Sequence, residues 1–176
     1  MFNLKKLDSI NASYIRKTET KTLTQMILDD KFIKIDLKKH HLDYIQKAIQ
    51  TVKQRLKNLS EVKPFTRFYF KNPEYPSQLL VWKDLPLNQI KNNLKIGEKA
   101  LEELDSGRFT IKQLETELKK TIAENNIGTG DLLWPLRVAL TGEKASPSPF
   151  EVAWVLGKKE TIQRIKDAIA KLLKHE

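Results

Sequence analysis

The chain contains no cysteine, and only three of its 176 residues are histidine. Without cysteine it has no disulfide framework and no thiolate ligands for zinc. The three histidines, His40, His41 and His175, do not have the spacing of common metal-binding motifs. No apolar run is long enough to cross a membrane, and the first residues lack the charged and then apolar pattern of a signal peptide. We therefore expect no metal, no membrane association and a cytoplasmic location.

Alternation of apolar and polar residues, the pattern of a half-buried strand, is also nearly absent, apart from an ambiguous run from Leu79 to Trp82. Apolar residues instead recur every three or four positions, which is the helical period. The clearest case is a helix predicted over about residues 38–56, whose one-sided apolar stripe consists of Leu42, Ile45, Ile49, Val52 and Leu56. Similar patterns predict helices over about residues 87–104, 111–123 and 159–173. The predicted fold class is all-α, without a Rossmann domain.

Prolines interrupt the helical pattern near the middle of the chain, at Pro64, Pro73 and Pro76. Proline fixes φ and restricts the residue before it, so the segment 72–76 is typical of a linker. With 40% hydrophobic residues, the chain has enough apolar material for a core on each side. We expect two small helical domains, residues 1–75 and 76–176.

Acidic residues are scarce in the first half of the chain. The net charge is +10, and residues 1–75 hold 16 Lys and Arg against 8 Asp and Glu, whereas residues 76–176 hold 16 against 14. A basic surface of this kind suits a polyanion such as nucleic acid. The alternative is a solvated lysine-rich face that only keeps the protein in solution.

Aromatic residues alternate with a cation in one short segment, at Phe65, Arg67, Phe68, Tyr69 and Phe70. Such interleaving is found on surfaces that stack nucleic-acid bases. On a helix, however, three of these side chains would face the interior of the domain. We therefore favour core packing for this segment.

The segment from Leu132 to Gly157 is the most informative. Its first half is a helix that is apolar on all sides and carries a single charge, Arg137, before Gly142 ends it. Residues 146–149, Ser-Pro-Ser-Pro, are stiff, and a new apolar helix follows them at once and ends at Gly157. The result is a rigid polar loop beside one arginine. Taken alone, the loop is more typical of an N-cap with proline at the helix start, and the arginine of an ion-pair partner.

These residues resemble the carboxy-terminal anticodon-binding domain of bacterial glutamyl-tRNA synthetases, the glutamate–tRNA ligases. The matching elements are the run Pro135–Gly142, the pair Ser146-Pro147 and the junction Leu156–Lys158. Residues 2–17 resemble the family's stretch just after its ATP-binding Lys-Met-Ser-Lys-Ser loop, so the resemblance covers essentially the whole chain. One difference is that the family often has glycine and leucine at positions 148 and 149.

The resemblance implies roles for individual residues. The pocket for the first or middle anticodon base would consist of Arg137, Ser146, Pro147 and Ser148. The position of Arg55 matches an arginine that recognises the third base, so the enzyme would accept glutamate tRNA, with cytosine there, and reject glutamine tRNA, with guanine. The tRNA backbone would be contacted by Lys5, Lys6, Arg16 and Lys17.

A complete ligase of this family activates glutamate with ATP and magnesium, and its amino-terminal catalytic domain carries His-Ile-Gly-His-type and Lys-Met-Ser-Lys-Ser-type motifs. Neither motif occurs in this sequence. We therefore expect a non-catalytic monomer that lacks the catalytic domain of the parent enzyme and binds tRNA-Glu. Two alternatives are a freestanding tRNA-binding or regulatory paralogue and a helical protein-interaction module.

Overall fold

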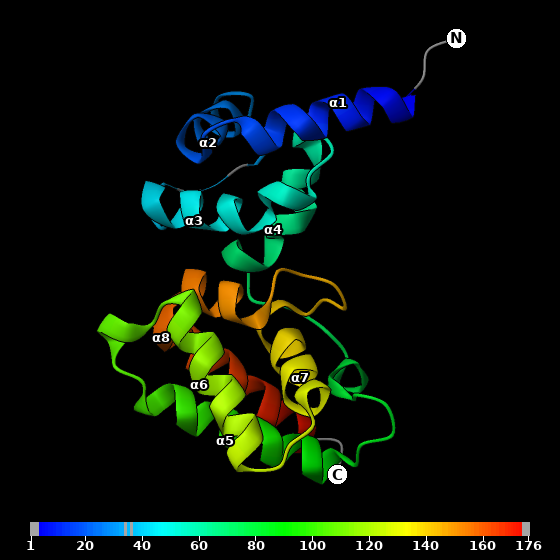
Figure 1. Ribbon diagram of the computed structural model, residues 1–176, viewed down its shortest axis with the longest axis vertical. Coiled ribbons are helices and arrows are strands. Elements are labelled where there is room, and N and C mark those ends of the chain that lie inside the picture. The colour runs from blue at the N-terminus through cyan, green and yellow to red at the C-terminus, as the bar shows by residue number, and fades with distance from the viewer. Residues whose placement is uncertain (1–3, 34, 36, 174–176) are drawn as a thin grey trace. The chain divides into compact units, whose positions relative to one another are not determined.

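The computed structural model describes residues 4–33, 35 and 37–173, with side chains described from Lys6 onward. This part of the chain forms eight α-helices and no strand, which confirms the all-α prediction (Figure 1). It divides into two compact units, residues 1–71 and 72–176. The segment predicted as a linker, residues 72–76, thus begins the second unit.

The first unit contains four α-helices: α1 (Leu4–Lys17), α2 (Thr20–Asp29), α3 (Leu42–Val52) and α4 (Val62–Phe70). Two short 3-10 helices, Lys53–Arg55 and Leu59–Glu61, lie between α3 and α4. Apolar residues from these elements and from the segments between them form one core, made of Ile15, Leu23, Ile27, Ile33, Ile45, Ile49, Val52, Leu56 and Val62.

The helix predicted over residues 38–56 is shorter than expected. α3 begins only at Leu42, because the positive charges of Lys38 and Lys39 are unfavourable at a helix N-terminus, whereas Asp43 suits the first turn. At the other end the chain passes into the 3-10 turn, and buried Leu56 is already extended, with φ −73° and ψ 132°. Of the apolar stripe, Ile45, Ile49, Val52 and Leu56 are in the core, whereas Leu42, at the start of α3, is 44% exposed.

The aromatic segment of α4 packs inward. Phe68 and Tyr69 are buried, and Phe65 and Phe70 pack against the core of the first unit. The Tyr69 hydroxyl lies 2.7 Å from Thr51 Oγ1, so its polar end has a partner. Core packing, the favoured interpretation, is confirmed for these rings.

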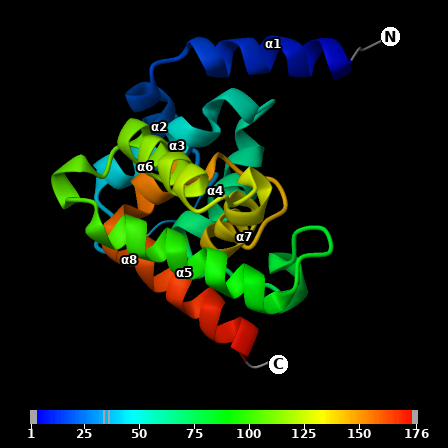
Figure 2. The same ribbon diagram turned by 60° about the horizontal axis from the view of Figure 1, so that its bottom comes forward.

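The second unit consists of α5 (Leu87–Glu103), α6 (Ile111–Glu124), α7 (Thr129–Thr141) and α8 (Pro149–Leu173), with 3-10 helices at Ser77–Leu80 and Ser106–Arg108. The ambiguous run from Leu79 to Trp82 is therefore not a strand. α8 packs against α5, α6 and α7 and runs beside α5 in Figure 2. Gly157 has φ 76° and ψ 167°, and this break divides α8 into two helices.

Pro135 lies inside α7 and has no N–H to offer the carbonyl of Asp131, one turn earlier. Asn93 of α5 supplies the missing donor, since its Nδ2 lies 3.1 Å from Asp131 O. Asn93 is 5% exposed, so this bond also satisfies a buried amide. The proline is thus accommodated by a neighbouring helix, which fixes α7 against α5.

Candidate nucleic-acid interface

Two separate hydrogen-bonding arrangements stabilise the carboxyl end of α7. Gly142 is in the left-handed conformation, with φ 70°, and its N–H donates to Val138 O at 2.7 Å. The buried guanidinium of Arg164, on α8, donates from Nη1 to Leu140 O at 2.6 Å and from Nε to Glu160 Oε1 at 2.7 Å. Carbonyls that a helix end leaves without a partner are thereby satisfied. The chain consequently leaves α7 at a fixed point and in a fixed direction.

Arg137 fixes the loop that follows. Its Nη1 donates to Ser146 O at 2.8 Å, to Ser146 Oγ at 3.0 Å and to Pro147 O at 3.1 Å. The Ser146 hydroxyl in turn donates to Pro147 O at 2.8 Å. Ser146 is only 2% exposed, and Pro147 is buried as well. The loop itself is therefore an intramolecular partner of this arginine.

Ser148 begins α8 as its N-cap. Its Oγ accepts a bond from Glu151 N at 3.2 Å, while Glu151 Oε2 accepts bonds from Ser148 N at 2.8 Å and from Ser148 Oγ at 2.7 Å. This is a capping box, and buried Pro149 occupies the first helical position, where proline is favoured. The N-cap interpretation of the serine–proline loop is confirmed.

Two residues of this site were missed from the sequence. Glu151 had a detectable signal, because a serine followed three residues later by glutamate is the capping-box spacing. Arg164 had none, since its contact with Leu140 O joins residues far apart in the chain. Both act by positioning the loop of Ser146, Pro147 and Ser148, which Arg137 of α7 holds.

Arg55 belongs to the first unit rather than to this cluster. It is exposed at the last position of the 3-10 turn Lys53–Arg55, directly before buried Leu56. Lys53, in the same turn, donates from Nζ to Thr18 O at the carboxyl end of α1. The turn that carries Arg55 is thus tied to α1.

The other predicted cations lie on α1. Lys6, Arg16 and Lys17 are exposed, whereas the side chain of Lys5 lies outside the described residues. Within the described ranges, no group of three or more His, Cys, Asp or Glu residues is placed to hold a metal ion. No helix in that part of the chain is long and apolar enough to cross a membrane.

Comparison with known protein families assigns this helical chain to a known class. Residues 18–169 match the family described as anticodon binding domain, and the chain belongs to that family. Within this class, it matches the carboxy-terminal third of glutamate–tRNA ligases, which confirms the resemblance seen in the sequence.

Individual relatives show the extent of the match. Over 174 residues the chain is 33% identical to the glutamate–tRNA ligase of Clostridium tetani, covering 98% of this chain and 35% of that protein. It is 31% identical over 176 residues to that of Dehalococcoides mccartyi, covering 98% and 36%. The chain therefore spans about a third of the length of these curated relatives.

Solved structures show the same fold. The crystal structure of a glutamate tRNA ligase from Elizabethkingia meningosepticum matches with a TM-score of 0.78 at 21% identity, covering 97% of this chain and 33% of that one. The glutamate-tRNA synthetase of Elizabethkingia anophelis matches with a TM-score of 0.73, also at 21% identity.

Proposed function

We propose that this chain recognises the anticodon of tRNA-Glu as the carboxy-terminal part of a glutamate–tRNA ligase. The match of residues 18–169 to the anticodon binding domain family is the observation that carries the proposal. The basic first unit and the rigid loop after α7 support it, because anticodon bases are unstacked and can be bound by a preformed polar surface.

The loop after α7 is the proposed pocket for the first or middle anticodon base. Arg137 and buried Ser146 act as positioning residues, since their hydrogen bonds run within the loop. Pro147 and Ser148 complete the pocket and hold its backbone through the start of α8. A loop fixed in this way presents its backbone groups to RNA with little further loss of conformational entropy.

Arg55 is proposed to recognise the third anticodon base. Its exposed guanidinium offers a planar set of donors that matches two acceptors at once. The exposed Lys6, Arg16 and Lys17, together with Lys5, are proposed to contact the tRNA backbone. Such contacts add affinity but no base preference.

We propose that another part of the ligase carries out the catalytic steps. Glutamate activation with ATP and magnesium belongs to the catalytic part that the longer relatives contain, whichever polypeptide carries it. We propose that this chain is a monomer and that it acts in the cytoplasm, where tRNA is aminoacylated.

The test is a comparison of two tRNAs with three proteins. Glutamate tRNA and a variant carrying guanine at the third anticodon base are titrated with wild type, Arg55→Gln and Lys57→Gln. Lys57 is an exposed cation two positions away, so its substitution removes the same charge at the same end of the unit. Wild type is expected to prefer glutamate tRNA about tenfold or more, as a well-placed bidentate base contact allows.

Arg55→Gln is expected to abolish this preference. Lys57→Gln is expected to lower the affinity for both tRNAs equally and so to preserve the preference. Equal binding of both tRNAs by wild type would refute recognition of the third base. An affinity that is unchanged by every anticodon substitution would refute the proposed function as a whole.

A further inference from the structure

Three aromatic side chains that are only partly buried meet where α3 packs against α4. His40, two residues before α3 begins, stacks on Tyr44, with ring centroids 5.2 Å apart and an angle of 25° between the ring planes. Phe70, at the end of α4, contacts both rings edge-on, with its centroid 5.3 Å from that of His40 and 6.0 Å from that of Tyr44. The Tyr44 hydroxyl donates to Tyr69 O at 2.6 Å, which fixes its ring against α4. We call His40, Tyr44 and Phe70 the aromatic cluster.

The aromatic cluster is anchored to the core but remains accessible to solvent. Phe70 packs against the hydrophobic core of the first unit, so the cluster has a rigid support. None of its three rings is buried, in contrast to the ring of Tyr69 beside them. Apolar side chains close to His40 in the sequence are exposed as well, since Leu37 is 58% and Leu42 44% exposed. Exposed apolar side chains that gather in one place commonly mark a binding site.

Cations adjoin the rings of the aromatic cluster. Lys38 and Lys39 directly precede its histidine, Lys71 directly follows its phenylalanine, and all three lysines are exposed. Asp43, in the first turn of α3, is paired with Lys47 at 2.8 Å. Surfaces that bind single-stranded nucleic acid combine aromatic rings, on which bases stack, with cations that neutralise phosphates. The chemistry of this surface therefore matches RNA better than it matches an uncharged or a basic partner.

We propose that the aromatic cluster binds an unstacked RNA base. The base stacks on the exposed part of the His40 and Tyr44 rings, and the phosphates beside it lie against the adjoining lysines. Every base has a π face, so this site adds affinity without selecting a particular base. That the RNA is a tRNA rests on the proposed function.

The aromatic cluster and Arg55 serve different nucleotides. His40 precedes α3, whereas Arg55 follows it, and the 11 residues of α3 alone span about 16 Å at a rise of about 1.5 Å per residue. A single base cannot reach both ends of this helix. Loss of the aromatic cluster therefore leaves the preference at the third anticodon position unchanged.

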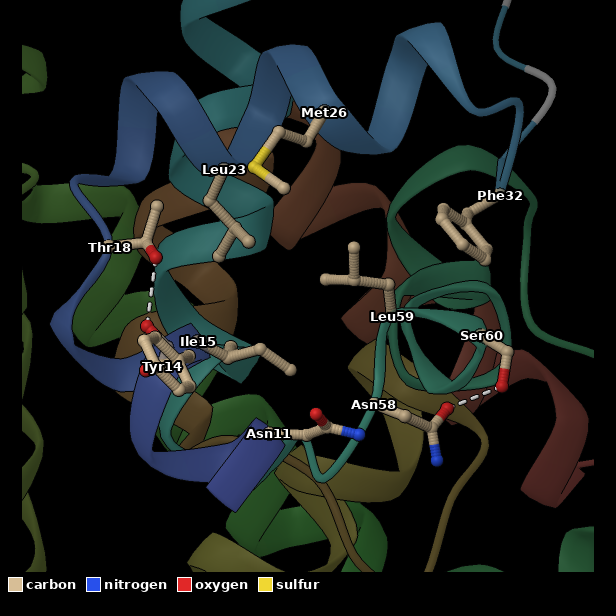
Figure 3. Close-up of a pocket in the computed structure, with 10 residues that line it drawn as sticks. All are labelled: Asn11, Tyr14, Ile15, Thr18, Leu23, Met26, Phe32, Asn58, Leu59 and Ser60. Carbon is tan, nitrogen blue, oxygen red and sulfur yellow. Dashed lines mark hydrogen bonds between the residues drawn. The ribbon is translucent and has the colours of Figure 1, made fainter. Parts of the chain in front are cut away.

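The hollow of the first unit, about 440 Å³ in volume, is less suited to an RNA base. Most of its apolar lining is aliphatic or thioether, and these side chains point toward a common opening in Figure 3, namely Ile15, Leu23, Met26 and Leu59. Its two aromatic rings, Tyr14 and Phe32, lie on opposite sides of that opening. Among the described residues that line the hollow, none is lysine or arginine. The hollow therefore lacks both the adjoining rings and the cations that a base and its phosphates require.

The experiment compares the wild-type chain with His40→Ala, His40→Phe and His41→Ala. His41 is exposed, makes no side-chain capping bond and is not part of the aromatic cluster, so His41→Ala removes the same side chain one residue away. His40→Phe keeps a ring in the cluster and removes only the imidazole nitrogens. Affinity is measured by titration for glutamate tRNA and for a single-stranded oligoadenylate that carries one 2-aminopurine, whose fluorescence falls when this base stacks on a ring.

His40→Ala is expected to lower the affinity for both RNAs about tenfold, as the loss of one base–aromatic stack does, and to reduce the quenching of 2-aminopurine. His40→Phe is expected to bind like wild type, because stacking requires the ring and not its nitrogens. His41→Ala is expected to bind like wild type as well. Circular dichroism and thermal unfolding show whether each variant is folded. If His40→Ala is unstable, His40→Leu, which fills the space without a ring, takes its place and is expected to show the same loss.

Equal affinities of His40→Ala and His41→Ala for both RNAs would overturn the proposed base site. A loss in His40→Phe as large as that in His40→Ala would also overturn it, because the ring would then not be the group that binds. Self-association that His40→Ala abolishes, with RNA affinity unchanged, would assign the aromatic cluster to a second copy of the chain and exclude the base site.

The anticodon comparison described above, repeated with these variants, separates the base site from the proposed function. Wild type that prefers glutamate tRNA, together with a His40→Ala variant that binds like His41→Ala, leaves the proposed function standing and refutes the base site. A loss of RNA affinity in His40→Ala, together with no anticodon preference in wild type, supports the base site and refutes the proposed function.

Discussion

At the scale of single residues, Arg137 connects the site to the stability of the fold. One of its nitrogen atoms bonds to two backbone carbonyls and a hydroxyl of residues 146 and 147. Bonds to a charged donor are stronger than neutral ones, and removing Arg137 takes that donor from both carbonyls, although the carbonyl of Pro147 keeps its bond from the Ser146 hydroxyl. The same side chain that the sequence indicates as a contact for tRNA is therefore also the support of its loop.

Substitution of Arg137 by methionine is expected to lower the free energy of unfolding by about 2 kcal/mol, because the carbonyls of Ser146 and Pro147 lose their charged donor. Urea denaturation followed by circular dichroism measures this loss. The control is Ser146→Ala, which removes one hydroxyl and keeps both carbonyl bonds, and is expected to cost only about 1 kcal/mol. An Arg137→Met variant as stable as wild type would show that the prolines alone hold the loop.

Tyr75 makes the stability of the fold depend on pH in the alkaline range. Burial raises the pKa of its hydroxyl, the negative charge of Asp167 raises the pKa further, and Arg164 partly opposes both. In the unfolded chain the tyrosine ionises near its ordinary pKa of about 10, whereas in the folded chain it keeps its proton to higher pH. Stability is therefore unaffected below about pH 10 and falls above it.

Urea unfolding of wild type and Tyr75→Phe between about pH 9 and about pH 11 tests this dependence. The variant is expected to lose less stability over that range, because phenylalanine has no proton to give up. It keeps the ring below Lys171 Nζ, which lies 4.0 Å from the ring centroid, and the bond from that amine to the backbone oxygen of residue 75. Parallel pH curves for the two proteins would show that other groups control the alkaline loss.

At the scale of elements, the coupling of α5 to α7 through Asn93 and Pro135 is open to a direct measurement. Asn93→Ala is expected to cost about 1–3 kcal/mol, because the carbonyl of Asp131 loses the bond from the amide of residue 93. In a Pro135→Ala background the new backbone N–H can bond that carbonyl, so the same substitution costs less. A double-mutant cycle in thermal or urea unfolding yields the coupling. Additive effects of the two substitutions would contradict this account of the proline.

The elements also show what the sequence could predict. Helical periodicity and glycine positions located α5 to α8 well, and Gly157, at positive φ, ends the first part of α8 where the sequence indicated a helix end. Local spacing also contained the capping box of Ser148, although Glu151 went unnoticed. These features depend only on neighbouring residues.

Contacts between distant residues could not be predicted in the same way. Asn93 and Arg164 look like ordinary polar residues of amphipathic helices, and only the packing of α5 and α8 against α7 brings them to the carbonyls of Asp131 and Leu140. The resemblance indicated Arg137 as a site residue, but its supporting bonds depend on where the loop folds back. The stiff loop and its N-cap followed from local sequence, whereas the bonds that support the loop depend on tertiary structure.

At the scale of the whole molecule, positive charge is concentrated in one unit. Residues 1–71 hold 16 Lys and Arg against 7 Asp and Glu, whereas residues 72–176 hold 16 against 15. Cations that neutralise phosphates release counterions, so each such contact steepens the fall of affinity with salt. The place of a lysine, rather than the total charge, then decides its effect on tRNA binding.

Two triple variants that lose the same charge distinguish the effect of where the lysines lie from the effect of the net charge. One replaces Lys21, Lys63 and Lys71 of the first unit by glutamine, and the other replaces Lys95, Lys112 and Lys159 of the second; all six are exposed. Affinity for glutamate tRNA is measured across a range of salt concentrations and plotted as log K against log salt. The first variant is expected to flatten this slope by up to about 0.7–0.9 for each lysine that contacts phosphate, while the second leaves it nearly unchanged. Equal flattening by both variants would mean that tRNA responds to net charge, and it would remove the argument that the first unit is the phosphate-binding surface.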